Sequence, residues 1–513
     1  MASLRRPRRG PPRTPRGRPA AGPVVAGAVL ALLLAACGSQ LDPSDVVNAG
    51  SGTGVEGGGT VVPGADPGTQ TDGTTPGASG DSGGAEIAST DTGSTSTGSG
   101  SESDGGTEGG TAPTGGGGDE ATGDNAPTGD TKAASCDGFD GEQPGMSGDK
   151  ITIANVSDIS GPVPGIFESA QQGTRAYAAF FNATSDICGR DLEVLLLDSR
   201  ADAGADQQAY ARACDESFAA VGSQSAFDAG GAETAEACGL PDIRAYSLST
   251  DRTNCATCYA AYAVQPGLVP NAMPQYWVKE EPDAVKSVGM IYINAGAAPE
   301  NAEAFRSAWE TNGWNIEVFQ GMDVSEFNYA PYVQQMKDAG VEFVNYIGPY
   351  QNTVKLQQAM QQQGFEPQVF MQDATIHDAN YVEQAGDLGN GAYVYSQTAL
   401  FDDDSIPEMK LYRSWLEQVD PGAVPNTYGL YAWSATRLFV EQAVGLGGKL
   451  NRETLLQAMT KVENWTSNGV HVPQNVAAKT TANCASIIQL NDGKWTQVSQ
   501  GDYLCGSMTN TRS

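Results

Sequence analysis

The chain has only two histidines among its 513 residues, His377 and His471. Neither lies in a spacing that is typical of a metal site or of a nucleophile with its base. The G-x-S-x-G elbow, the P-loop G-x-x-x-x-G-K-[ST] and a G-x-G-x-x-G that leads from a strand into a helix are missing from residues 136–513. We therefore expect no enzyme activity, no cofactor and no metal site. The one kind of catalysis that these absences do not exclude is catalysis by carboxylates scattered along the chain.

Basic side chains are scarce. From Cys37 onward, 22 Lys and Arg residues stand against 61 Asp and Glu residues, a net charge of −39. A surface of this sign repels a phosphate backbone, so a nucleic-acid partner is excluded. Acidity on this scale favours solubility and does not by itself argue for a cationic ligand.

Residues 38–135 contain no aromatic side chain, and their only basic residue is Lys132. Gly, Ser, Thr, Pro and Asp dominate, so the segment cannot bury a core. Its fifteen acidic residues give a net charge of −14, which favours an extended chain. As a flexible coil it has a span of roughly 50–60 Å. It suits a tether, although a disordered segment without a spacing role fits the composition equally well.

The N-terminus begins with seven arginines and no acidic residue, followed by an apolar run at residues 24–34. This order is typical of a secretory signal, and the run is shorter than the ~20 residues that span a bilayer. The sequence Leu-Ala-Ala-Cys that ends at Cys37 resembles a bacterial lipobox. We expect residues 1–36 to be a lipoprotein signal peptide and Cys37 to be acylated and to anchor the chain to the cell membrane, with an ordinary cleaved signal as the alternative.

From Cys136 onward, short apolar strands alternate with stretches of helical length. This alternation predicts parallel sheets wound on both faces by helices, and two successive runs of it predict two α/β lobes. Residues 169–182, 428–444 and 452–462 show helical spacing, and Asn491-Asp492-Gly493 predicts a hairpin within residues 485–499. The expected strands are residues 151–158, 191–199, 218–223, 242–248, 259–266, 287–294, 315–321, 341–348, 368–373 and 391–397.

Eight cysteines follow Cys37, and they admit about a hundred pairings. Their positions favour four disulfides. The Cys255-Ala256-Thr257-Cys258 stretch also allows a redox or zinc role, but it leads into a strand and lacks further ligands, which favours a structural bond. The expected pairs are Cys136 with Cys188, Cys214 with Cys238, Cys255 with Cys258, and Cys484 with Cys505.

Three stretches resemble the branched-chain amino-acid-binding family, the type I periplasmic substrate-binding proteins of ABC importers. They are NVSDISGPVPG at residues 155–165 with the helix after it, GRDLEVLLLDSRAD at residues 189–202, and VNYIGPYQNTVKLQQAMQQQGF at residues 344–365. The similarity covers roughly residues 150–502. It implies two doubly wound lobes joined by a three-crossover hinge, with the first lobe at about residues 149–265 and 398–468 and the second at about 266–397 and 469–513.

The resemblance also implies a function. Ligands of open α/β sheets bind outside the carboxyl ends of the strands, so two facing lobes would close on a small polar solute and present it to an ABC permease. In that family, first-lobe hydroxyls hold an α-carboxylate and a second-lobe carboxylate faces the ammonium group.

Six residues are expected at the ligand because of their positions. Ser225, Ser249 and Thr250 follow first-lobe strands, where such residues also form turns. Tyr350 matches a family aromatic position. Asp373 lies where the family has its acidic residue, and a helix N-cap is the alternative. Phe167, after the Ser-Gly-Pro turn, is placed at the side-chain pocket, with a core or surface aromatic as the alternative.

Two departures weaken the assignment of a substrate. The family often places a tyrosine where residues 295–301 read AGAAPEN, and Asp373 is shorter than the more familiar glutamate. The ligand is therefore an amino acid, an amide, urea or another small polar molecule. A ligand sensor, an enzyme with paired carboxylates and an interaction module without a small ligand are the rival functions on the same fold.

Overall fold

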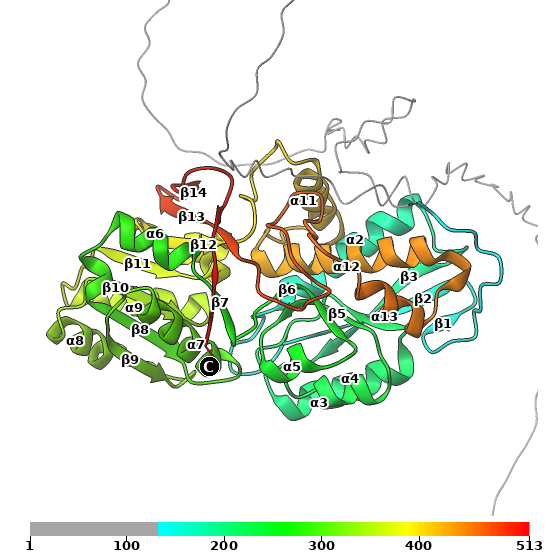
Figure 1. Ribbon diagram of the computed structural model, residues 1–513, viewed down its shortest axis with the longest axis horizontal. Coiled ribbons are helices and arrows are strands. Elements are labelled where there is room, and N and C mark those ends of the chain that lie inside the picture. The colour runs from blue at the N-terminus through cyan, green and yellow to red at the C-terminus, as the bar shows by residue number, and fades with distance from the viewer. Residues whose placement is uncertain (1–131, 512–513) are drawn as a thin grey trace, which may run out of the picture.

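The strands of the first half form one sheet in the computed structural model, which describes residues 132–511 (Figure 1). The sheet is parallel except for β1 (Met146–Ser147), which pairs antiparallel with β2. In spatial order the parallel strands are β3 (Asp191–Asp198), β2 (Lys150–Ser157), β4 (Ala219–Val221), β5 (Asp242–Ser247) and β6 (Cys258–Ala263).

Successive β2 side chains alternate between two cores, as the pleat of a strand requires. Ile151 and Ile153 pack with the helices of one face, whereas Ala154 and Val156 pack with the helices of the other. The first face carries α2 (Glu168–Thr184), α11 (Pro407–Val419), α12 (Thr427–Leu446) and α13 (Arg452–Met459), and the second carries α3 (Ala203–Glu216), α4 (Ala232–Ala237) and α5 (Thr250–Asn254).

The helices α2 and α12 cross at two glycines. A Cβ atom on Gly173 would lie 2.1 Å from the carbonyl oxygen of Gly429, so this close approach excludes a side chain. The crossing brings the N-terminus of α12, which follows the second lobe in sequence, back onto the first lobe.

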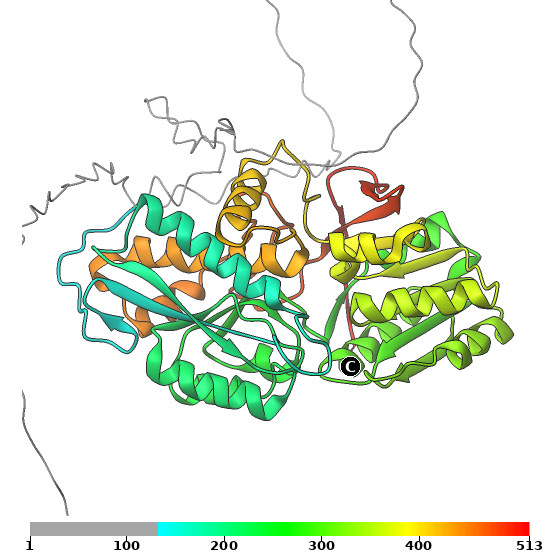
Figure 2. The ribbon, with the colours of Figure 1, turned by 180° about the vertical axis from the view of Figure 1, so that it is seen from behind.

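The second lobe has a sheet of the same kind with an antiparallel edge (Figure 2). Asp492 and Gly493 have φ values of 49° and 74°, and they form the left-handed turn of the expected C-terminal hairpin. The parallel strands in spatial order are β9 (Ile316–Met322), β8 (Val288–Ile293), β10 (Phe343–Ile347), β11 (Val369–Gln372) and β12 (Tyr393–Ser396), followed by the antiparallel β13 (Cys484–Asn491) and β14 (Lys494–Gln497), with β15 (Leu504–Cys505) against β13.

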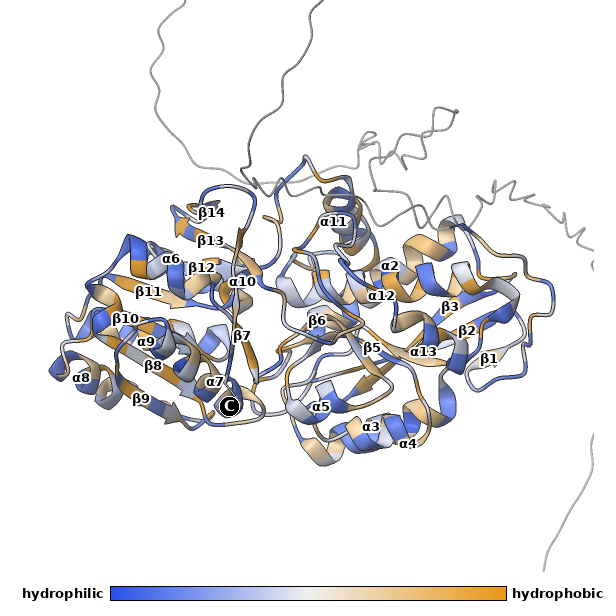
Figure 3. Cartoon of the chain, viewed as in Figure 1, coloured by the Kyte–Doolittle hydropathy of each residue, from blue (hydrophilic) through white to orange (hydrophobic). Residues whose placement is uncertain are grey.

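Helices cover both faces of this second sheet, and the hydropathy colours show apolar strands between helices with polar outer faces (Figure 3). One core contains residues of α6 (Ala272–Glu280) and α7 (Ala298–Thr311), and the other contains residues of α8 (Ala330–Asp338), α9 (Tyr350–Gln362) and α10 (Ala379–Ala385). Short 3₁₀ turns lie at Ala284–Lys286, Ala374–Ile376, Gly386–Gly389 and Gly447–Lys449.

The chain passes between the lobes at three neighbouring segments. The backbone N–H of Gln265 donates to Thr481 Oγ1 at 2.8 Å, and Gln397 Nε2 donates to the carbonyl of Cys484 at 3.2 Å. These bonds tie all three crossings together. Beside them, β7 (Leu268–Pro270) pairs with β16 (Met508–Asn510).

The third crossing lies later in the chain than the family resemblance implies. Val470 and Val476 belong to the core of the first lobe, and the N–H of Ala477 donates to the carbonyl of Val462. Residues 469–480 therefore pack with the first lobe, and the chain leaves it near Thr481. Residues 469–480 form isolated β-bridges and no strand. Their sequence therefore has no alternation from which the lobe could be predicted.

The N-terminal end of the described chain is attached to the first lobe. The N–H of Ala134 donates to the carbonyl of Val444 at 3.1 Å, and Gly448 donates to the carbonyl of Ser135 at 2.8 Å. The last residues of the expected tether thus pack against the end of α12. The signal segment, Cys37 and the tether up to residue 131 lie outside the described residues.

The eight cysteines of the described chain form the four expected pairs: Cys136–Cys188, Cys214–Cys238, Cys255–Cys258 and Cys484–Cys505. Cys255 and Cys258 are only 3% and 2% exposed, which fits a structural bond. Within residues 132–511, no helix is long and apolar enough to span a bilayer.

Candidate functional site

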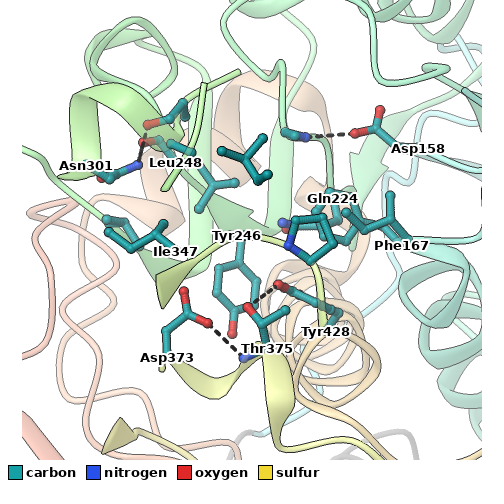
Figure 4. A pocket seen from close by; sticks show the side chains of 18 of the residues that line it. Asp158, Phe167, Gln224, Tyr246, Leu248, Asn301, Ile347, Asp373, Thr375 and Tyr428 are labelled. Atoms are coloured by element: carbon teal, nitrogen blue, oxygen red, sulfur yellow. Dashed lines mark hydrogen bonds between the residues drawn. The ribbon is translucent and has the colours of Figure 1, made fainter. Parts of the chain in front are cut away.

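A cavity of about 210 Å³ lies between the lobes (Figure 4). Its walls are residues that follow the carboxyl ends of strands in both sheets, where open α/β folds bind ligands. From the first lobe, Asp158, Gln224, Leu248 and Val264 come after β2, β4, β5 and β6; from the second, Ala295, Val324, Gly348, Asp373 and Gln397 come after β8, β9, β10, β11 and β12.

Aromatic rings form much of the first-lobe wall. Phe167 and Tyr428 pack edge to face with their centroids 4.8 Å apart, and Tyr246 packs on Tyr262 at 4.7 Å. Tyr431 completes the cluster, 5.1 Å from Tyr246. Burial raises the pKa of the Tyr262 and Tyr428 hydroxyls, so both hydroxyls stay neutral at physiological pH.

Asp158 closes one side of the cavity and is saturated with donors. Ser199 Oγ, Ser225 Oγ and the N–H of Ala201 donate to Oδ1 at 2.5, 3.0 and 2.9 Å, and the N–H of Ala226 donates to Oδ2 at 2.8 Å. A carboxylate that accepts several such bonds is well compensated. Asp158 therefore joins the loops after β2, β3 and β4 and positions the cavity wall.

Asp373 is the other carboxylate of the lining, and it has few partners. It caps the 3₁₀ turn Ala374–Ile376, where Oδ1 accepts the N–H of Thr375 at 2.9 Å. Burial raises the pKa of this carboxyl, and hydrogen bonds from Thr375 offset part of that shift. None of the lining residues of the described chain is Lys, Arg or His, so no cationic side chain of the wall compensates the Asp373 charge.

Three amide side chains of the lining carry unsatisfied atoms. Gln224 is 1% exposed, and neither its Oε1 nor its Nε2 has a partner within residues 132–511. Asn301 Oδ1 and Gln397 Oε1 are likewise unpartnered there, although the nitrogen of each side chain donates. Buried polar atoms without partners are uncommon in folded proteins, which is consistent with a polar ligand.

Hydrogen bonds join the lobes around this cavity, so the described conformation is a closed one. Figure 4 shows two of them, Asn301 Nδ2 to the carbonyl of Leu248 and the hydroxyl pair Thr375–Tyr428. The bonds between the lobes include Asn301 Nδ2 to Leu248 O at 3.1 Å, Thr375 Oγ1 with Tyr428 Oη at 3.0 Å, Asn426 Nδ2 to Asp378 Oδ2 at 3.1 Å, the N–H of Ala297 to Ala226 O at 3.0 Å, and Thr250 Oγ1 to Glu300.

Two of the six expected ligand residues line the cavity. Phe167 belongs to the aromatic wall and Asp373 is the partly compensated carboxylate, which also acts as the N-cap that the sequence offered as an alternative. Their contact with a ligand stays a prediction.

The other four residues lie outside the lining. Ser225 is fully buried and donates to Asp158, and Ser249 caps α5 by accepting the N–H of Arg252 at 3.2 Å. Thr250 reaches across to Glu300, and the hydroxyl of Tyr350 accepts from Gln384 at 3.4 Å. These four hydroxyls are engaged within the protein, and their role as ligand contacts stays untested.

Sequence reasoning missed several lining residues. Asp158 stands in the quoted NVSDISG stretch, directly after an apolar strand, a position that could have marked it. Gln224 likewise follows β4. No such signal marks Tyr246, Tyr262 and Tyr428, because a tyrosine within a strand or helix is normally interpreted as a residue of the hydrophobic core. No cluster of three potential metal-ligating residues occurs in the described part of the chain.

Comparison with protein families shows a match to the periplasmic binding protein family over residues 150–494. A comparison with curated proteins found no match.

Among solved structures, three relatives have the same fold at low identity. The Streptococcus pneumoniae branched-chain amino acid transporter substrate-binding protein in complex with isoleucine is 17% identical, with a TM-score of 0.58 over 68% of this chain and 99% of that one. A solute-binding protein from R. palustris in complex with 4-hydroxybenzoate is 17% identical, with a TM-score of 0.58 over 70% and 98% of the two chains. A fatty acid ABC transporter substrate-binding protein from Thermomonospora curvata is 14% identical, with a TM-score of 0.61 over 74% and 97%.

Proposed function

The chain belongs to the periplasmic binding protein family, and we propose that it is the solute-binding subunit of an ABC importer. It captures a small polar solute that carries an ammonium group, an amino acid or a related amide, and presents it to the permease. The observation that carries this proposal is the cavity between the lobes, enclosed by strand ends of both sheets and bridged by hydrogen bonds between them. Closure about the three crossings would bury the solute and create the surface that a permease recognises.

The cellular place of the protein follows from the same proposal. We propose that the chain is extracytoplasmic and that acylated Cys37 anchors it to the cell membrane, with the aromatic-free segment as a spacer. Four disulfides fit an oxidising compartment. The size of the cavity, about 210 Å³, is below the roughly 300–1,000 Å³ of drug-sized pockets, which suits a solute of amino-acid size.

Binding without catalysis is the better reading of the two lining carboxylates. An enzyme with paired acids needs an accessible oxygen on each carboxyl group to exchange a proton with the substrate. The Asp158 carboxylate is held by four donors and so offers no second acid beside Asp373.

The test is thermal unfolding of the purified chain against a panel of amino acids, amides, amines, urea and small organic acids. A ligand at ~100 times its dissociation constant adds ~2.7 kcal/mol to the native state, enough for a shift of about 3 °C. A shift confined to one chemical class supports capture of that class. No shift on the panel, together with no small molecule released from the denatured protein in mass spectrometry, would refute solute binding.

Transport and sensing share this binding step, and uptake separates them. Deleting the gene should abolish uptake of the radiolabelled solute in an importer, and a chain that carries a substitution at Cys37 should restore uptake poorly because it lacks its anchor. Normal uptake in the deletion strain would favour the ligand sensor instead.

A further inference from the structure

The charges of the cavity wall select the kind of solute. Among the lining residues, all within the described chain, only Asp158 and Asp373 carry an ionisable carboxyl, and no cationic side chain opposes them. Asp158 already has four donors, whereas Asp373 accepts from Thr375, two residues further along its own loop. A charge that is shielded from water is costly unless it is paired, so the Asp373 carboxylate favours a cationic group of the ligand over an anionic one.

The residues expected to hold a carboxylate are engaged elsewhere. Ser225 donates to Asp158, Ser249 caps α5, and Thr250 bonds Glu300 in the opposite lobe. The fully buried polar atoms of the lining that have no partner within the described chain are amide atoms, chiefly both ends of Gln224. An amide presents donors and an acceptor together, which suits a neutral amide or hydroxyl of the ligand better than a carboxylate.

The remaining wall suits the body of an organic cation. The rings of Phe167, Tyr246 and Tyr428 belong to the cavity lining, and Tyr428 bonds Thr375 close to Asp373 (Figure 4). Aromatic faces attract cations and also bury apolar groups. Second-lobe residue Ile347 extends the apolar surface.

Resting on the proposed function, we infer that the solute is an organic amine without a carboxylate: an ammonium group on an apolar body, with at most a neutral polar group such as an amide at its other end. The ammonium pairs with Asp373, the apolar body lies against the aromatic wall, and the neutral group exchanges hydrogen bonds with Gln224. An amino-acid amide fits this description, whereas the carboxylate of the free amino acid would add a negative charge to a lining that already holds Asp158 and Asp373 and no cationic side chain.

The test is isothermal titration calorimetry of the purified chain with two matched series. The aromatic series is 2-phenylethylamine, phenylalaninamide, phenylalanine and 3-phenylpropionate, and the aliphatic series is isoamylamine, leucinamide, leucine and 4-methylpentanoate. In at least one series the amine and the amide should bind roughly ten-fold or more tightly than the amino acid, and the anion should not bind. Equal or tighter binding of the amino acid or the anion would overturn the inference.

Two variants test whether Asp373 is the residue that binds the ammonium group. Asp373→Asn should weaken binding of the amine roughly 30-fold or more, the usual scale for removing one partner of a desolvated charge pair, while the protein still unfolds cooperatively on heating. Asp323→Asn is the matched control: it lies beside lining residue Val324, and its retained oxygen can still accept the N–H of Ser325. Asp323→Asn should leave the affinity unchanged, and an equal loss in both variants would contradict the role of Asp373.

Failure of this inference and failure of the proposed function give different results. Binding of an organic acid, urea or a free amino acid on the broad panel, with no binding of either amine series, overturns the amine alone. Absence of every ligand on the broad panel overturns solute capture itself.

Discussion

Replacing Asp158 by asparagine should destabilise the first lobe, because one carboxylate holds three loops. In Asp158→Asn, the amide oxygen would keep the place of Oδ1, beside Ser199, Ser225 and Ala201, but the new NH₂ group would face the N–H of Ala226, which donates at 2.8 Å. The new NH₂ group and the N–H of Ala226 would then both be donors, so no hydrogen bond could form between them. A hydrogen bond to a charged group contributes about 1.5–3 kcal/mol, and the other three bonds weaken with the loss of charge, so we expect Asp158→Asn to cost about 3 kcal/mol.

Calorimetry of the unliganded protein measures this cost. With an unfolding entropy of about 2.1 cal/mol/K per residue, residues 132–511 would lose about 4 °C in Tm, and more if the first lobe unfolds by itself. Asp202→Asn is the control, because Asp202 caps α3 by accepting the N–H of Ala205 at 2.8 Å and asparagine caps equally well. A Tm of Asp158→Asn within about 1 °C of the control would refute the reasoning.

Two further predictions concern the closed form and the pH dependence of stability. Tyr428→Phe removes a hydrogen bond between the lobes at 3.0 Å, and ligand affinity measured by calorimetry should fall about 2–10-fold; an unchanged affinity would contradict a role for this bond in closure. Burial raises the pKa of Glu441 to about 7, and the nearby Arg437 offsets only part of the shift. Because the folded pKa exceeds the unfolded one, the stabilisation from this group is complete below about pH 4.5 and is lost as the pH rises through about 7. The Tm of Glu441→Gln should therefore rise relative to the wild type between pH 5 and pH 8, and parallel curves would contradict the assignment.

The elements of the fold were largely predictable because their signals are local. The alternation in residues 151–158 corresponds to β2, the Asn491-Asp492-Gly493 turn to the C-terminal hairpin, and the helical spacing of residues 428–444 to α12. The lobe to which residues 469–480 belong was not predictable in this way. The segment forms isolated β-bridges, which do not require a regular alternation of apolar and polar residues.

The cavity was only partly predictable. A polar residue after a strand marks the correct end of the sheet, and the family resemblance pointed to Asp373, but neither signal says which way a side chain points. Ser225 meets that rule and yet donates to Asp158, while Gln224, one residue earlier, lines the cavity. Tyr428 reaches the cavity only because α12 returns to the first lobe from a distant part of the chain.

Closure of the lobes around a solute is the central claim, and the distance between the lobes tests it most directly. Spin labels on cysteines introduced at exposed Pro164 in the first lobe and at Phe327 in the second, 89% exposed, would report that distance by double electron–electron resonance. With the panel compound that gives the largest thermal shift, the account predicts a distance distribution that becomes shorter and narrower than that of the free protein. An unchanged distribution, in a sample that calorimetry shows to be saturated with that compound, would contradict it.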